Sequence, residues 1–506
     1  MKFWSILNSK IILVLFSLVY CETSIGQQKC LILTSQKQIA NGLSDPFFQT
    51  LTNLIQCPQH IENVQQILEA QFQNKKYLVA NRGRNNPLLG SFSIFESFST
   101  SSQHRPTDIF LGHFTHLKSL NGKSLLDLDQ EPSEGKLIIE LIAWDSKKGY
   151  YNFYELIGQG GMGQWFYRGD SKDILLDNQA IYLTQPTQFG QRLRCSGCHI
   201  SGGPIMKELS FPHNDWWTKS RPLIFQHTPS ASFLKNLNLL DTAESLSKQV
   251  QLGIQRLEMS PGYQNVIQAL SIPAQLRPLF CEMEINLESD IVPTESSGAI
   301  KIPSTSIAGS FAGPLNFMIP KSLYQNLLQK HGLHFPETNL MDSDHAWLTP
   351  VKGYSDLLAI QSLKSKGLVD DKTILDIYFS TPIGSLMNKE RCSLVQLVPN
   401  TFNWKPGFIE KLKTLNLPIA KALLQKMTEP SLTPQAYQRA ITQWYQQTNQ
   451  KLLAGDLESF FVQLLENRNA VFNSAISKNP RGQILEPGFR VIFPVPSKNQ
   501  RFQGQR

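Results

Sequence analysis

The residues best suited to chemistry are Cys195, Cys198 and His199, in the run Arg-Cys-Ser-Gly-Cys-His at positions 194–199. Two cysteines three residues apart lie on one side of a helical turn, where their thiols can bond the two vinyl groups of a haem. A histidine directly after the second cysteine can then bind the iron from the same face. Only about 0.002 matches to C-x-x-C-H are expected by chance from the Cys and His usage of this chain. The motif therefore predicts one covalently attached haem.

Three other interpretations of the cysteine pair are a thioredoxin-like redox centre, a zinc site and a structural disulfide. A redox pair is expected between a strand and a helix, whereas the residues that follow here, 200–204, read Ile-Ser-Gly-Gly-Pro and indicate a loop. A zinc site needs two further ligands at a suitable spacing, and the chain has no second C-x-x-C and no H-x-x-x-H. These features favour haem over the other three sites.

The second axial ligand of the iron is left open by the sequence. Met259 follows His199 by 60 residues, and Met206 and His213 follow it by 7 and 14 residues. Each of these candidates has an ordinary alternative role, since Met fills apolar cores and His hydrogen-bonds at surfaces. A Met thioether would raise the reduction potential and suit electron transfer, whereas an open position would allow binding of small molecules or peroxide chemistry.

On these residues the chain resembles the c-type cytochromes. The specific part is the motif itself, and residues 193–217 are also similar to exported bacterial proteins that carry a single haem motif. The resemblance implies haem c held by Cys195, Cys198 and His199, with His199 as the proximal iron ligand. It implies an exported monohaem cytochrome that passes electrons to a redox partner protein. It does not extend to a second axial ligand.

Two other functions are compatible with the same motif. A haem enzyme, peroxidase-like or oxidase-like, would use an open distal position; the dihaem peroxidases carry two such motifs, whereas this chain has one. A sensor or binding protein would use haem to respond to a ligand. The large regions outside the motif suit a substrate site or a docking role equally well.

The N-terminus has the pattern of a secretory signal peptide. Lys2 and Lys10 precede the apolar run Ile11–Val19, whose nine residues are too few to span a bilayer. Small residues at positions 24 and 26 predict cleavage before Gln27 and a periplasmic or otherwise exported protein. The alternatives are a retained anchor and a lipoprotein acylated at Cys21. No later stretch is long and apolar enough to span a membrane.

Cleavage there leaves six cysteines, four of them outside the haem motif. In an oxidising compartment these four can pair in three ways or remain as buried thiols. We favour the pairs Cys30–Cys57 and Cys281–Cys392, each on one side of the motif.

The remaining pattern predicts an α+β multidomain chain. After the signal peptide (1–26), a helical segment and an antiparallel β unit occupy 27–185, ending with a strand at 180–184. A mostly helical, cytochrome c-like haem region follows at 186–290. The rest, 291–506, is mixed and then helical, with a strand at 375–379. The G-x-G-x-x-G run at 158–163 predicts a turn between strands, since a strand and not a helix follows it.

The distribution of charge along the sequence argues against a nucleic-acid partner. Lys and Arg exceed Asp and Glu by 48 − 40 = 8, but no run of five like charges occurs. Nucleic-acid binding proteins concentrate their basic residues in a patch or stripe, so no nucleic-acid partner is expected. Mild basicity suits an acidic redox partner or association with an anionic membrane surface.

Overall fold

The computed structural model describes most of the chain between Lys29 and Val491. The described ranges are 29–80, 92–100, 106–115, 137–183, 194–197, 199–204, 217–220, 231–281, 283–289, 299–304, 315–331, 346–380, 389–430, 433–463, 484–486 and 489–491. Cys198, Met206, His213 and the signal-peptide segment lie outside these residues.

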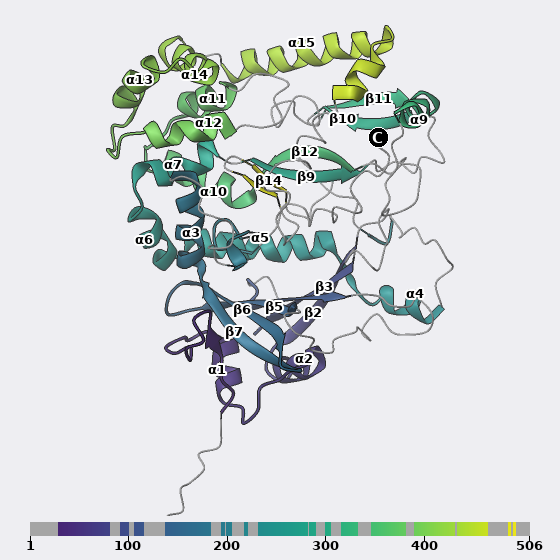
Figure 1. The fold of residues 1–506 in the computed structure, drawn as a ribbon, viewed down its shortest axis with the longest axis vertical. Coiled ribbons are helices and arrows are strands. Elements are labelled where there is room, and N and C mark those ends of the chain that lie inside the picture. The colour runs from purple at the N-terminus through teal and green to yellow at the C-terminus, as the bar shows by residue number, and fades with distance from the viewer. Residues whose placement is uncertain are drawn as a thin grey trace, which may run out of the picture.

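An eight-stranded sheet forms the lower half of the molecule in Figure 1. Its order is β1-β7-β6-β5-β4-β3-β2-β8. The strands are β1 (Leu33–Thr34), β2 (Gln73–Ala80), β3 (Phe92–Ser99), β4 (Ile109–Thr115), β5 (Leu137–Asp145), β6 (Tyr150–Gln159), β7 (Met162–Asp170) and β8 (Asp241–Thr242). Strands β2 to β7 pair antiparallel in chain order, and the two-residue edge strands β1 and β8 pair parallel. The α+β class and the antiparallel unit predicted from the sequence are confirmed.

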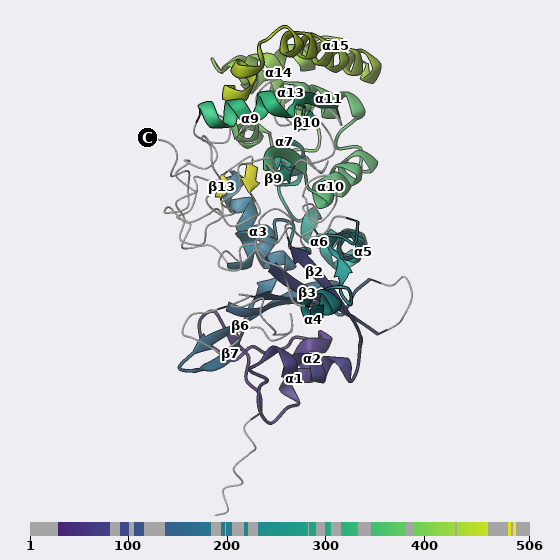
Figure 2. The same ribbon diagram turned by 90° about the vertical axis from the view of Figure 1, so that its right-hand side faces the viewer.

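Each face of this sheet is covered by helices (Figures 1 and 2). Helices α1 (Pro46–Thr52) and α2 (Ile61–Glu69) pack on one face, where Phe47, Leu51 and Leu68 are buried. Helix α1 begins where Asp45 accepts a hydrogen bond from the Phe48 amide at 2.9 Å, which is the N-cap arrangement favoured by Asp before Pro.

The opposite face carries α3 (Ser171–Leu183), α5 (Ala243–Met259) and α6 (Pro261–Gln268). Their apolar side chains share one core with Tyr151 and Phe153 of β6. The predicted boundary between residues 185 and 186 therefore does not separate two hydrophobic cores, because helices from 231–268 complete the core of the β unit.

Two predicted strands are helices. Residues 180–183 of the stretch predicted at 180–184 are the end of α3, and Thr184 lies outside the described residues. The buried residues of α3 recur at Ser171, Ile174, Leu175, Asn178 and Gln179. This spacing presents one helical face to the sheet. Local β-branched and aromatic content suggested a strand, and tertiary packing determined otherwise.

The stretch at 375–379 is the end of α11 (Asp371–Phe379). Asp370 caps that helix by accepting from the Thr373 amide at 2.8 Å, a start signal that outweighs the strand propensity of the last residues. The G-x-G-x-x-G run is the β6–β7 turn, as predicted: Gly160 and Gly161 have φ of 59° and 79°, values that glycine adopts without strain.

The upper half of the molecule in Figure 1 is mostly helical. One core there lies among α7 (Ile272–Phe280), α10 (Tyr354–Ser365), α11, α12 (Lys389–Ser393), α13 (Lys405–Lys413) and α14 (Pro418–Thr428). A second core joins the hairpin β10 (Ala299–Pro303) and β11 (Asn316–Pro320) with α9 (Lys321–Lys330) and α15 (Pro434–Leu453). Below the β10–β11 hairpin in Figure 1 lies a sheet of order β12-β9-β14-β13, made of Ala346–Lys352, Met283–Ser289, Phe489–Val491 and Ile484–Glu486. The short helix α4 (Ala231–Leu237) precedes β8.

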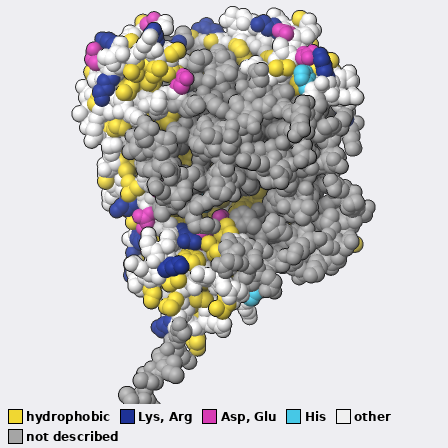
Figure 3. All heavy atoms as spheres, viewed as in Figure 1, with side chains coloured by type: hydrophobic (Ala, Val, Ile, Leu, Met, Phe, Trp, Pro, Cys, Tyr) yellow, Lys and Arg dark blue, Asp and Glu magenta, His cyan; other side chains and the backbone are white. Residues whose placement is uncertain are grey.

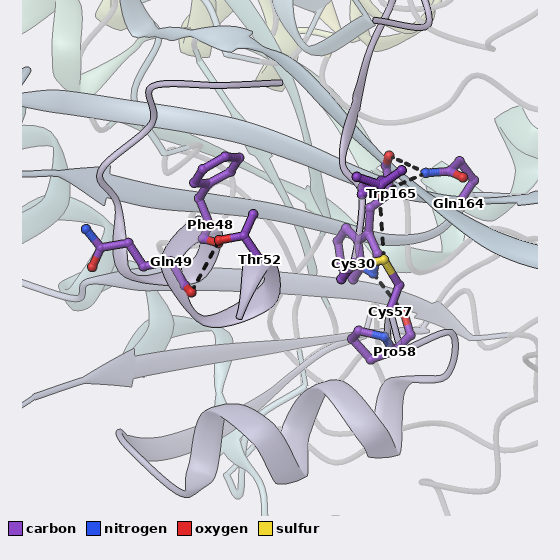
Figure 4. The surroundings of a disulfide bond; sticks show 9 residues. Cys30, Phe48, Gln49, Thr52, Cys57, Pro58, Gln164 and Trp165 are labelled. Atoms are coloured by element: carbon purple, nitrogen blue, oxygen red, sulfur yellow. Dashed lines mark hydrogen bonds between the residues drawn. A yellow bond between two sulfur atoms is a disulfide. The ribbon is translucent and has the colours of Figure 1, made fainter. Parts of the chain in front are cut away.

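The two favoured cysteine pairs form disulfides, Cys30–Cys57 and Cys281–Cys392. Figure 4 shows the first beside Trp165, whose ring nitrogen donates to the Pro58 carbonyl at 2.8 Å. The second links the end of α7 to α12 inside the helical core. Two disulfides are compatible with export.

The described surface offers neither a membrane span nor a basic stripe on the face in view. No helix in the described ranges is long and apolar enough to cross a bilayer. On the face drawn in Figure 3, Lys and Arg side chains of these residues are scattered among hydrophobic and acidic ones.

A buried carboxylate links α2 to the sheet. Glu96 of β3 is fully buried and accepts from Gln65, from Asn74 at 2.5 Å, and contacts His113 Nε2 at 3.2 Å. Burial alone would raise the pKa of Glu96, but the hydrogen bond and charge of His113, the charge of Lys76 and the bond from Asn74 outweigh it. The pKa therefore lies below its ordinary value of 4.5.

This shift predicts a loss of stability in acid. Because the pKa of Glu96 is lower in the folded state, its carboxylate stabilises the fold above about pH 4.5, and that stabilisation disappears as the pH falls through the folded-state pKa. We expect Glu96→Gln to cost about 3 kcal/mol at pH 7 and to show a shallower decline below pH 4.5 than the unmodified protein. Urea unfolding followed by tryptophan fluorescence at pH 7, 5 and 3.5 measures both. Parallel pH dependence in the two proteins would contradict the assignment.

Candidate functional site

The first cysteine of the motif lies in a single 3-10 turn, η3 (Arg194–Gly197). Cys195 is partly buried and packs against the core between the sheet, α3 and α5. Its carbonyl accepts from the His199 amide at 3.1 Å, which keeps the two residues on adjacent turns of the chain. After His199 the chain runs into a buried loop instead of the helix that a thioredoxin-like pair would open.

The His199 ring is oriented by its own loop. Its Nδ1 lies 2.7 Å from the Gly203 carbonyl oxygen. A carbonyl can only accept, so Nδ1 carries a proton, and in the neutral imidazole Nε2 therefore carries the lone pair. This is the tautomer that a metal ligand needs, with the other ring nitrogen held by a backbone carbonyl. The ring makes a T-shaped contact with Phe153 of β6, with the ring centroids 5.0 Å apart.

The loop of residues 199–204 is held along its whole length. Five successive carbonyl oxygens, those of residues 199 to 203, each accept a hydrogen bond from a side chain. Asn178 Nδ2 donates to the carbonyls of His199 and Ile200 at 3.4 and 3.2 Å. Tyr263 donates to the Ser201 carbonyl at 2.5 Å, and Ser171 donates to the Gly202 carbonyl at 2.7 Å.

Glycine at position 202 lets this loop lie against α3. Gly202 has φ of 75°, and a Cβ there would lie 2.6 Å from the Ser171 Cα. No larger residue fits both the backbone conformation and the contact. The next two residues of the loop, Gly203 and Pro204, are buried against α5.

Sequence reasoning did not identify Ser171, Asn178 and Tyr263. All three are buried, with exposed fractions of 0%, 3% and 1%, and they come from α3 and α6. Burial raises the pKa of Tyr263 well above its ordinary value, and the nearby Glu258 charge raises it further, so its hydroxyl stays a donor at neutral pH. The only sequence signal is a polar residue on the apolar face of a helix, which by itself does not indicate a partner.

The candidate second ligands stay predictions. Met259 is the last residue of α5 and is 81% exposed, whereas Leu257 of the same helix is buried. This exposure does not test Met259 as a ligand, and it stays a candidate. Met206 and His213 lie outside the described residues, as does Cys198.

Among the described residues, His199 meets one requirement of a covalently attached haem. Among the described residues, no group of three or more His, Cys, Asp or Glu side chains could hold a metal. A covalent haem asks only for the thiols and one oriented imidazole, because the porphyrin supplies the other iron ligands. His199, in the tautomer set by Gly203, meets the requirement for the imidazole.

Comparison with known proteins adds no relative to this description: no family model, curated protein or solved structure matches the chain.

Proposed function

We propose that this protein is an exported monohaem c-type cytochrome that binds haem c through Cys195, Cys198 and His199 and transfers electrons to a redox partner protein. The observation that carries the proposal is the hydrogen bond from His199 Nδ1 to the Gly203 carbonyl, directly after a C-x-x-C-H motif. The bond leaves Nε2 as the ligating atom, and it strengthens the imidazole as a donor to iron.

The chain has defined tasks in this function. A bound haem supplies one-electron chemistry between ferrous and ferric iron. The two cysteines tether the group, His199 presents Nε2, and the Gly203 carbonyl holds the Nδ1 proton. Phe153 packs against the imidazole in a T-shaped contact, which helps to fix the orientation of the ring. The two disulfides and the signal-peptide pattern support attachment outside the cytoplasm.

The test is the visible spectrum of protein exported from cells that attach haem c, reduced with dithionite before and after carbon monoxide. We expect a Soret band of covalent haem that remains after acid–acetone extraction. A band that carbon monoxide leaves unchanged would indicate two protein ligands and support electron transfer. A band that shifts would move the proposal to a haem enzyme or sensor with an open distal position. A protein without a Soret band would refute haem binding.

A further inference from the structure

The loop that presents His199 is fastened to parts of the fold that lie outside the motif. Asn178 of α3 and Tyr263 of α6 donate to three successive carbonyls of the loop, those of residues 199 to 201. The donors are buried, so water does not substitute freely for them. Helix α3 is anchored in turn, because Ser171 Oγ accepts from the Tyr151 amide of β6 at 3.0 Å and donates to Gly202.

These contacts leave little freedom for the carbonyl that orients the imidazole. Gly203 directly follows the residues whose carbonyls accept these hydrogen bonds. Leu257 of α5 packs against Gly203, because a Cβ built on Gly203 would lie 3.1 Å from the Leu257 side chain. A stronger bond from Nδ1 raises the basicity of the imidazole and favours ferric iron, which lowers the reduction potential. Movement of Gly203 away from His199 would weaken that bond.

We propose that Tyr263 and Asn178 are positioning residues for the proximal ligand: they fix residues 199–201 so that the Gly203 carbonyl holds the His199 ring. The effect on the iron rests on the proposed function. The hydrogen bonds from Tyr263 and Asn178 to the loop, which we call the loop clamp, are present in the chain without haem. The sheet and the helices α3 and α6, and not the motif alone, therefore tune the iron ligand.

The experiment compares Tyr263→Phe and Asn178→Ala with Tyr77→Phe in the exported full-length protein. Tyr77 is a matched control, because it is buried in the same apolar core and its hydroxyl contacts Ser97 at 2.9 Å and not the loop. The readouts are amide hydrogen exchange of the peptide spanning 199–204 and the reduction potential. We expect exchange about tenfold faster in Tyr263→Phe, which loses one buried hydrogen bond to the loop, and at least as fast in Asn178→Ala, which loses two. Exchange in Tyr77→Phe is expected to stay within about twofold of the unmodified protein.

We also expect both loop variants to keep their haem and to show a higher reduction potential than the unmodified protein and Tyr77→Phe. A haem-loaded variant pair with unchanged exchange or an unchanged potential would overturn this inference and leave the proposed function intact. If the unmodified exported protein contains no haem, the proposed function is overturned, and so is the effect of the loop clamp on the iron ligand. In that case the exchange data would still report whether the loop clamp exists.

Discussion

Replacing His199 with alanine is expected to abolish normal haem incorporation: the exported protein loses the Soret band of a histidine-ligated haem c, or retains a minor species with a shifted band. The imidazole is the only iron ligand that the motif supplies, and the Gly203 carbonyl holds it in the ligating tautomer at 2.7 Å. Cys198→Ala is expected to have the same effect, because it removes one of the two thioether tethers. Pyridine haemochrome absorbance of purified protein, normalised to protein concentration, measures both variants.

The matched control is His60→Ala. His60 precedes α2 on the opposite side of the sheet, and it makes no side-chain cap hydrogen bond to that helix. It should keep the haem content and spectrum of the unmodified protein. Full haem with an unshifted band in His199→Ala would exclude His199 as the ligand, and loss of haem in both variants would point to a general folding defect.

Removing the Cys281–Cys392 disulfide is expected to have the largest effect on stability. This bond closes a loop of 111 residues, and the chain-entropy estimate for such a loop is about 4 to 5 kcal/mol. Both cysteines are buried in the helical core, with exposed fractions of 1% and 0%. Alanine at both positions removes the constraint on the unfolded chain and leaves a small void in that core. We expect the free energy of unfolding of the helical half to fall by about 4 kcal/mol or more.

The comparison is the double variant Cys30→Ala/Cys57→Ala, whose bond closes a loop of 27 residues and is expected to contribute about 3 to 4 kcal/mol. Each protein is unfolded in urea and followed by far-ultraviolet circular dichroism and by limited proteolysis. Proteolysis shows which half opens first: the helical half in the first variant, and the sheet with α1 in the second. An unchanged urea midpoint in Cys281→Ala/Cys392→Ala would contradict the constraint.

Features encoded over short distances in the chain were predicted well. The β5, β6 and β7 strands follow from runs of β-branched and aromatic residues, and the glycines at 160 and 161 form the predicted turn between β6 and β7. Within the described residues, the strands expected at 180–184 and 375–379 are helix ends, at 180–183 and 375–379. There the local preference is outweighed by the sheet-facing surface of α3 and by the Asp370 cap of α11.

The sequence by itself predicted the chemistry of the candidate site, because C-x-x-C-H places two thiols and an imidazole within a few residues, where spacing alone governs what they can reach together. It also narrowed the disulfides to three pairings. The tertiary structure decided which pairing forms, because a disulfide depends on which distant segments pack together. It likewise decided that Ser171, Asn178 and Tyr263 hold the loop after His199. Those contacts join α3 and α6 to the motif across long stretches of chain, and only burial of the shared apolar core brings them within hydrogen-bond distance.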